Sequence, residues 1–212
     1  MEESRKYQIT NEVLNAVTHG IAFILAILGL VLLVLKGSGS GLENTVVFAI
    51  YGASLTLLFF FSTLFHSLIF TKASKVLQVF DHSSIYLLIA GTYTPYCVLS
   101  VGGNQGFSLL VSIWILAILG IIYKSITLPK MTSVPKISTV IYIIMGWLCL
   151  TAIVPLWNNL PHLSFWLLVL GGIVYTSGAF FYTVKFPFNH VVWHLFVMLA
   201  ACLMWFSVYL SA

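Results

Sequence analysis

Charged residues and cysteines are both scarce in this sequence. Of its 212 residues only 7% are charged, whereas 60% are hydrophobic. This balance excludes an ordinary soluble domain, whose surface needs far more charge, and it indicates a membrane protein. The three cysteines are an odd number and lie far apart, so no disulfide framework is expected and we interpret them as buried apolar residues: Cys97, Cys149 and Cys202.

Only five residues are acidic, and none lies deep inside an apolar run. The full set is Glu2, Glu3, Glu12, Glu43 and Asp81. A charge-relay transporter carries acidic groups at membrane depth, so this class of protein is disfavoured. The last apolar run contains no lysine. A retinal protein is therefore disfavoured as well, because its Schiff base needs a buried lysine.

Seven apolar runs are present, each close to the length of about 20 residues that crosses a hydrocarbon core of about 30 Å. They are Val17–Leu35, Thr45–Phe70, Val79–Leu99, Phe107–Tyr123, Ile137–Trp157, Leu163–Val184 and His190–Leu210. Short polar loops, including residues 36–41 and 125–136, join them. We predict an all-α, polytopic membrane protein, a bundle of seven transmembrane helices that forms a single domain over residues 1–212. A short segment of about residues 1–16 precedes the first span.

Positive charge is divided unevenly between alternate loops. Only Lys36 lies on one side, and the other eight lie on the side of the N-terminus: Arg5, Lys6, Lys72, Lys75, Lys124, Lys130, Lys136 and Lys185. Because cytoplasmic loops retain positive charge during insertion, we expect the N-terminus in the cytoplasm and the C-terminus outside. The net charge of +4 reflects this topology, so we expect membrane lipids and no nucleic acid as partners.

Two histidines open the last apolar run. His190 and His194 are four residues apart, which places both side chains on one helix face and lets them bind one metal ion. Ionisable groups beside an apolar span need a partner and indicate a functional site. His66 ends the second run. If these spans are neighbours, His66, His190 and His194 supply the three nitrogens of a catalytic zinc site, with water as the fourth ligand.

Two further residues are candidates for catalysis. Asp81, which opens the third run, would orient or deprotonate the water. Ser62 lies one helical turn before His66 and would orient a ligand or stabilise a developing oxyanion. Simpler roles are also open: Asp81 as the N-cap of the third helix, and His66 as an interfacial histidine. Three polar residues at the same end have no assigned role: Glu12, His19 and His82.

Several motifs together resemble the haemolysin III family, within the larger group of progestin and adiponectin receptor relatives. They are Asn15-Ala-Val-Thr-His-Gly20, Ser62-x-x-x-His66, Asp81-His-Ser-Ser-Ile-Tyr with Ala90-Gly-Thr-Tyr-Thr-Pro95, and His190-x-x-x-His194. The resemblance covers nearly the whole chain. It implies a seven-helix membrane protein with a cytoplasmic N-terminus and zinc held by His66, His190 and His194. It also implies that Ser62 and Asp81 lie beside the metal and its water.

The resemblance implies more than one function. The superfamily is also similar to the alkaline ceramidases, and some members hydrolyse lipid amides, whereas the bacterial type is associated with cytolysis and with membrane-lipid homeostasis. We therefore expect a zinc-dependent hydrolase of membrane lipid amides or esters, in a bacterial cytoplasmic membrane. A pore-forming haemolysin and a receptor or sensor with a structural zinc are the alternatives. An open coordination position favours the hydrolase, and four protein ligands favour the structural role.

Overall fold

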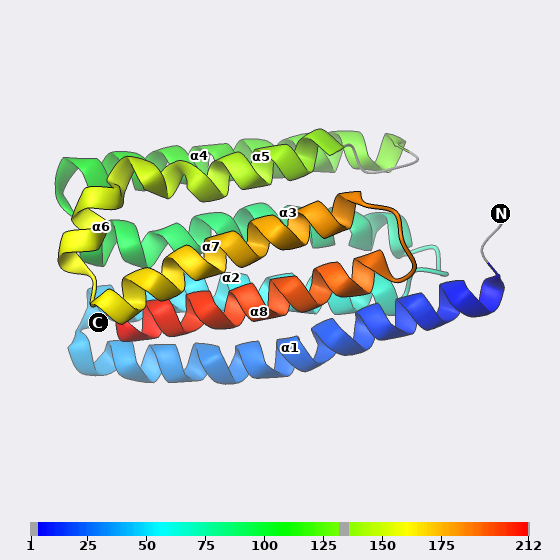
Figure 1. The fold of residues 1–212 in the computed structure, drawn as a ribbon, viewed down its shortest axis with the longest axis horizontal. Helices are drawn as coiled ribbons and strands as arrows, with labels where there is room; N and C mark the ends of the chain where they lie inside the picture. The colour runs from blue at the N-terminus through cyan, green and yellow to red at the C-terminus, as the bar shows by residue number, and fades with distance from the viewer. Residues whose placement is uncertain (1–3, 132–135, 212) are drawn as a thin grey trace.

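The structure is a computed structural model that describes residues 4–131 and 136–211. Residues 1–3 of the expected N-terminal segment, and residues 132–135 with the Lys136 side chain in the expected 125–136 loop, lie outside the described part. Every regular element in the described residues is a helix. The helices lie side by side along the long axis of the molecule, and the two termini lie at opposite ends (Figure 1).

The seven predicted spans are confirmed, since seven helices are long and apolar enough to cross a membrane. The elements are α1 (Arg5–Ser40), α2 (Leu42–Ser67), α3 (Ser74–Pro95) with the π-helical η1 (Tyr96–Val101), α4 (Gly103–Thr127) with the 3₁₀ turn η2 (Leu128–Lys130), α5 (Lys136–Trp147) with the 3₁₀ segment η3 (Leu148–Ala152) and α6 (Ile153–Asn159), α7 (His162–Thr183), and α8 (Asn189–Leu210). The fifth span is thus built from three consecutive pieces.

The first helix starts much earlier than its apolar run. We expected a span over residues 17–35, but α1 begins at Arg5 because Ser4 caps it: the Ser4 hydroxyl accepts a hydrogen bond from the backbone N–H of Tyr7. Apolar content marks where a helix meets lipid, whereas capping and hydrogen bonding decide where it starts. Most of the polar N-terminal segment is therefore helical.

The same helix also ends later than expected. Residues 36–40 were predicted as a loop, but they continue α1, and only Gly41 separates α1 from α2. Gly41 has a φ of 118°, which favours glycine. A Cβ atom on Gly37 would lie 2.7 Å from the Cα of Thr45. Gly37 and Gly41 therefore permit a tight reversal of the chain with close contact between α1 and α2. The prediction of a loop over residues 36–41 was wrong.

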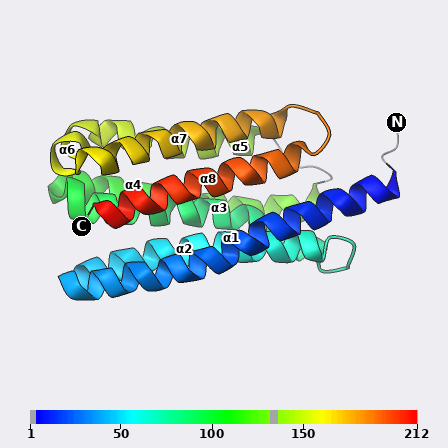
Figure 2. The same ribbon diagram turned by 60° about the horizontal axis from the view of Figure 1, so that its bottom comes forward.

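The helices form a closed arrangement around the centre of the molecule. Helix α1 packs between α2 and α8, α3 packs between α2 and α4, and α7 packs against α8. Helix α5 contacts both α3 and α7. Figure 2, turned from the first view, shows α1 crossing in front of α2, with α8 above them. This order brings the end of α2 and the start of α8 together around α1.

Polar and apolar side chains on α1 are distributed as in a membrane helix. Asn15 and His19 are buried, whereas Leu25, Leu28 and Leu32 are exposed on the outer face. A soluble helix would place these leucines inside. The outward leucines match a hydrocarbon environment, in which polar groups turn toward the protein interior.

Proline explains the interrupted fifth span. Pro155 in α6 has no N–H, so the carbonyl of Thr151 loses its usual helical partner four residues later. The Gln105 side-chain amide, at the start of α4, donates to that carbonyl instead, at 2.9 Å. The freed backbone group is thereby satisfied, as a membrane span requires.

Candidate metal centre

Three histidines from two helices meet at the end of the bundle that carries the N-terminus. His66 lies in the last turn of α2, and His190 and His194 lie in the first two turns of α8. Their candidate ligand atoms all lie within 4.8 Å of one another. The ring centroid of His66 is 5.0 Å from that of His190 and 4.9 Å from that of His194. The structure therefore brings the three predicted ligands together in an arrangement that could hold a metal ion.

A carboxylate fixes the orientation of His66. The Nδ1 atom of His66 lies 2.6 Å from Oε2 of Glu12 on α1. Because a carboxylate only accepts hydrogen bonds, Nδ1 carries the proton and Nε2 keeps its lone pair, the form that binds a metal. The buried Nε2 has no hydrogen-bond partner among the described residues. A bound cation would satisfy this otherwise costly atom, so the residues present fit a metal.

A fourth histidine lies against the cluster. The ring of His19 on α1 stacks on His194 with a centroid distance of 3.5 Å and an interplanar angle of 6°. Its Nδ1 lies 2.7 Å from Oγ of Ser62, and Oγ1 of Thr18 lies 3.4 Å from Nδ1 of His194. Ser62 was expected beside the imidazole of His66. The structure places its hydroxyl in contact with His19, so His19 sets the direction of this hydroxyl.

Asp81 lies inside a helix. Because α3 begins at Ser74, the predicted N-cap role of Asp81 is wrong, and the cap position belongs to Ala73. The residues between 74 and 80 extend the helix before the apolar run starts. The half-buried Asp81 borders the same cavity as His190 and His194. Its carboxylate makes no hydrogen bond with the part of the chain that the structure describes, so it is available to a ligand.

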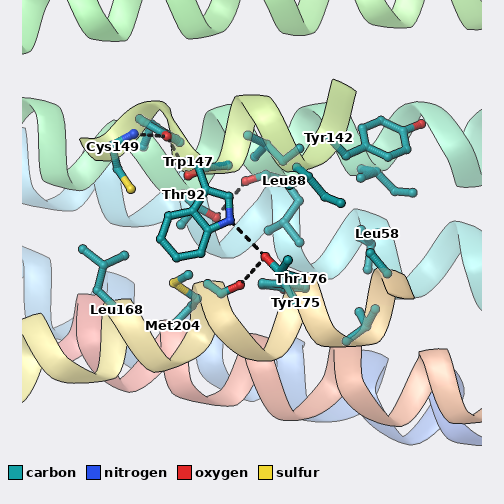
Figure 3. A pocket seen from close by; sticks show the side chains of 18 of the residues that line it. Leu58, Leu88, Thr92, Tyr142, Trp147, Cys149, Leu168, Tyr175, Thr176 and Met204 are labelled. Atoms are coloured by element: carbon teal, nitrogen blue, oxygen red, sulfur yellow. Dashed lines mark hydrogen bonds between the residues drawn. The ribbon is translucent and has the colours of Figure 1, made fainter. Parts of the chain in front are cut away.

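A cavity of about 210 Å³ occupies the centre of the bundle. The histidines and the one acidic residue of its lining, together with Ser62, gather at the end that holds the histidine cluster: His19, Ser62, Asp81, His82, His190 and His194. The rest of the lining is mainly apolar and aromatic, as the close view in Figure 3 shows for Leu58, Leu88, Leu168 and Met204. His66 is not among the lining residues. The cavity is thus most polar at one end and mainly apolar along the remainder, which suits an amphipathic molecule.

One hydrogen bond between α5 and α7 borders this cavity. The indole N–H of Trp147 donates to Oγ1 of Thr176 at 3.0 Å (Figure 3). Both residues also border a groove on α7 together with Phe180 and Phe181. The pair therefore lies between the cavity and this groove, and it satisfies two polar groups in apolar surroundings.

Sequence reasoning did not assign the contacts that α1 makes with the cluster. Glu12 and His19 had no assigned role, and Thr18 was not singled out. A signal was present, since Glu12, Asn15 and His19 recur at three- and four-residue spacing within a helix that is otherwise apolar on most faces. Such a polar stripe in a membrane helix faces the protein interior. His82 borders the cavity, and its carbonyl accepts a hydrogen bond of 3.0 Å from the Tyr142 hydroxyl.

Fold and site together define the class: a multi-pass, all-helical membrane protein with a histidine cluster that could hold a metal. Comparison with known proteins then gives the family. The family described as Haemolysin-III related matches residues 7–205, and the chain belongs to it. The resemblance stated from the motifs is confirmed. The matched segment contains every residue of the site.

Individual relatives are similar over most of their length. Hemolysin-3 of Bacillus cereus is 48% identical over 202 residues, which cover 94% of this chain and 91% of the relative. The Hemolysin-3 homolog of Bacillus subtilis (strain 168) is 42% identical over 204 residues, covering 95% and 94%. Monocyte to macrophage differentiation factor of Homo sapiens is 30% identical over 202 residues, covering 92% and 82%. The membrane bundle as a whole is therefore shared with these proteins.

Proposed function

We propose that this protein is a zinc-dependent hydrolase that cleaves an amide or ester bond of a membrane lipid. One observation carries the proposal: three histidines converge where a largely apolar cavity ends in polar residues. Three imidazoles and one open position are the ligand set of a catalytic zinc. The cavity around them suits a molecule with a polar head and an apolar chain.

Each residue of the site has a part in this proposal. His66, His190 and His194 hold the metal, and zinc when bound would polarise a carbonyl group and make water acidic enough to react. Asp81 accepts the proton of the reacting water at its carboxylate. Ser62, oriented by His19, donates a hydrogen bond from Oγ to the carbonyl oxygen as negative charge develops there.

The location of the substrate follows from the proposed topology. The side of the bundle with the N-terminus carries most of the Lys and Arg residues, so we place it in the cytoplasm and the C-terminus outside. The metal centre then lies near the inner leaflet of the bacterial cytoplasmic membrane, and the seven helices act as one domain. Lipids of that leaflet are the proposed partners, and nucleic acid is not.

Elemental analysis of detergent-purified protein tests the metal first. We expect about one zinc per chain in the wild type and none in the His190→Ala/His194→Ala variant, with monodisperse elution of both. The Asp81→Asn variant should retain zinc and lose lipid amide or ester hydrolysis by about 100-fold, because only the proton acceptor is removed.

Other outcomes would overturn the proposal in distinguishable ways. Zinc bound without hydrolysis of any amide or ester lipid in mixed micelles would indicate a structural metal, as in a receptor or sensor. Well-folded protein that takes up no zinc but releases dye from lipid vesicles would indicate a pore. Hydrolysis that persists in the metal-free double variant would reject the assigned site.

A further inference from the structure

The residue before α8 has a strained backbone. Phe188 has φ 60° and ψ 23°, and it is the sole non-glycine residue with positive φ among residues 4–131 and 136–211. A bulky side chain rarely adopts this left-handed conformation, which glycine adopts readily. Strain of this kind persists only where neighbouring contacts impose it. His190, a proposed metal ligand, follows two residues later.

The contact that holds Phe188 comes from the other end of the chain. Its backbone N–H donates to the hydroxyl of Tyr7 at 2.9 Å, and the two rings are 4.8 Å apart. Tyr7 lies in the first turn of α1, which has 36 residues and so extends roughly 54 Å at 1.5 Å per residue. In Figure 1 the start of α1 projects beyond the neighbouring helices. This projecting end nevertheless makes a specific contact at the start of α8.

The same helix contacts both segments that carry the candidate ligands. Glu12 bonds His66 of α2, and Thr18 lies against His194 of α8. Tyr7 adds a third contact, to the backbone that leads directly into His190. The segment that connects α7 to α8 is also held from the α7 end, because the side-chain amide of Asn189 donates to the carbonyl of Val184 at 3.0 Å.

We propose that Tyr7 is a positioning residue for the metal centre: its hydroxyl holds Phe188 in the left-handed conformation that starts α8 with His190 facing His66. Tyr7 does not contact the metal or a substrate. Without the hydroxyl, Phe188 relaxes toward an ordinary backbone conformation and the first turn of α8 shifts. The inference rests on the proposed metal site, but the conformational effect of Tyr7 is measurable without metal.

Four variants test the inference by zinc titration of metal-free, detergent-purified protein against a chromophoric chelator. Tyr7→Phe should weaken zinc binding by about 10-fold, as expected when a supporting contact of a metal ligand is lost. Phe188→Gly should retain wild-type affinity, because glycine adopts the left-handed conformation without strain. The double variant Tyr7→Phe/Phe188→Gly should stay within about 2-fold of Phe188→Gly. Tyr123→Phe, on the exposed side of α4, is the matched control and should not change the affinity.

Amide hydrogen exchange over residues 186–194 provides a readout that needs no metal. Exchange should be faster in Tyr7→Phe than in the wild type. In the double variant the exchange rate should be close to that of the Phe188→Gly single variant. Wild-type affinity and exchange in Tyr7→Phe would overturn the inference, as would equal weakening in the single and double variants. If the wild type binds no zinc, the proposed function fails, and the exchange rates still decide whether Tyr7 holds Phe188.

Discussion

At the scale of the residue, Glu12 determines what the imidazole of His66 can do. Its carboxylate accepts a hydrogen bond from the Nδ1–H of His66, which leaves the Nε2 lone pair free to bind a metal together with the other two histidines. The pair is largely buried, with side-chain exposures of 3% for His66 and 17% for Glu12. A carboxylate in such surroundings strengthens the hydrogen bond and fixes the tautomer and the orientation of the imidazole ring.

Replacing this carboxylate with an amide should weaken metal binding without changing the fold. We expect Glu12→Gln to lower zinc affinity by about 10- to 100-fold, because a neutral acceptor replaces a charged one behind the ligand. Competition with a chelator of known affinity measures the change. Glu43→Gln, at the exposed start of α2, is the matched control. Equal affinities in both variants would show that Glu12 does not support the site.

At the scale of the element, one side chain of α3 stabilises the break in the fifth span. The Tyr93 hydroxyl faces the carbonyls of Met145 and Gly146, at 2.8 and 2.9 Å, and accepts from the backbone N–H of Cys149 at 2.7 Å. The change from α5 to η3 would otherwise leave these groups without partners in an apolar interior. A non-regular backbone inside a membrane span requires such compensation.

The Tyr93→Phe variant should therefore be less stable, by about 1–3 kcal/mol, because backbone groups at the break lose their partner. Unfolding in mixed micelles, followed by circular dichroism, measures the loss, and Tyr123→Phe serves as the exposed control. Zinc affinity should stay at the wild-type level, since Tyr93 lies outside the histidine cluster. Equal stability of the two variants would mean that the broken backbone finds other partners.

Each span could be predicted because a helix that crosses lipid needs a continuous run of apolar residues, and such a run is visible directly in the sequence. Helix ends were predicted less well. The polar residues after Arg5 were assigned to a segment before the first span, and the Gly-Ser residues after Lys36 to a loop, but both stretches belong to α1. Their structure is decided by a serine cap and by close packing at Gly37, neither of which depends on hydropathy.

The candidate site was predictable to the extent that its residues share a helix or a recognisable spacing. His190 and His194 lie one turn apart on the same helix. Predicting that His66 joins them required only the assumption that α2 and α8 are neighbours. Glu12 and Tyr7 act across helices through contacts at 2.6 and 2.9 Å, and no local pattern determines such distances. Ser62 and Asp81 border the cavity, and their catalytic roles stay predictions.

At the scale of the whole molecule, the uneven distribution of Lys and Arg determines the proposed orientation. The end of α1 near Lys36 lies opposite the end that carries the turn between α2 and α3, as Figure 1 shows. In a membrane these two ends contact different compartments. The topology is therefore open to a labelling experiment at exposed positions.

Single cysteines in a chain whose native cysteines are replaced by alanine should report the orientation. Ser40→Cys should react with a membrane-impermeant thiol reagent in intact cells, whereas Lys72→Cys should react only after permeabilisation. Both positions are exposed, so access to the compartment decides the result. The reverse labelling pattern would place the N-terminus and the histidine cluster on the outer side.

The histidine cluster also sets an order of events during synthesis. His66 belongs to the second span and is made early, whereas His190 and His194 belong to the last span and leave the ribosome near the end of translation. The cluster cannot form on a nascent chain, and α1 must retain its place beside α2 until α8 arrives. The proposed metal would consequently be loaded after α8 has been inserted, and a chain stalled before α8 would carry Glu12 and His66 without the other two histidines.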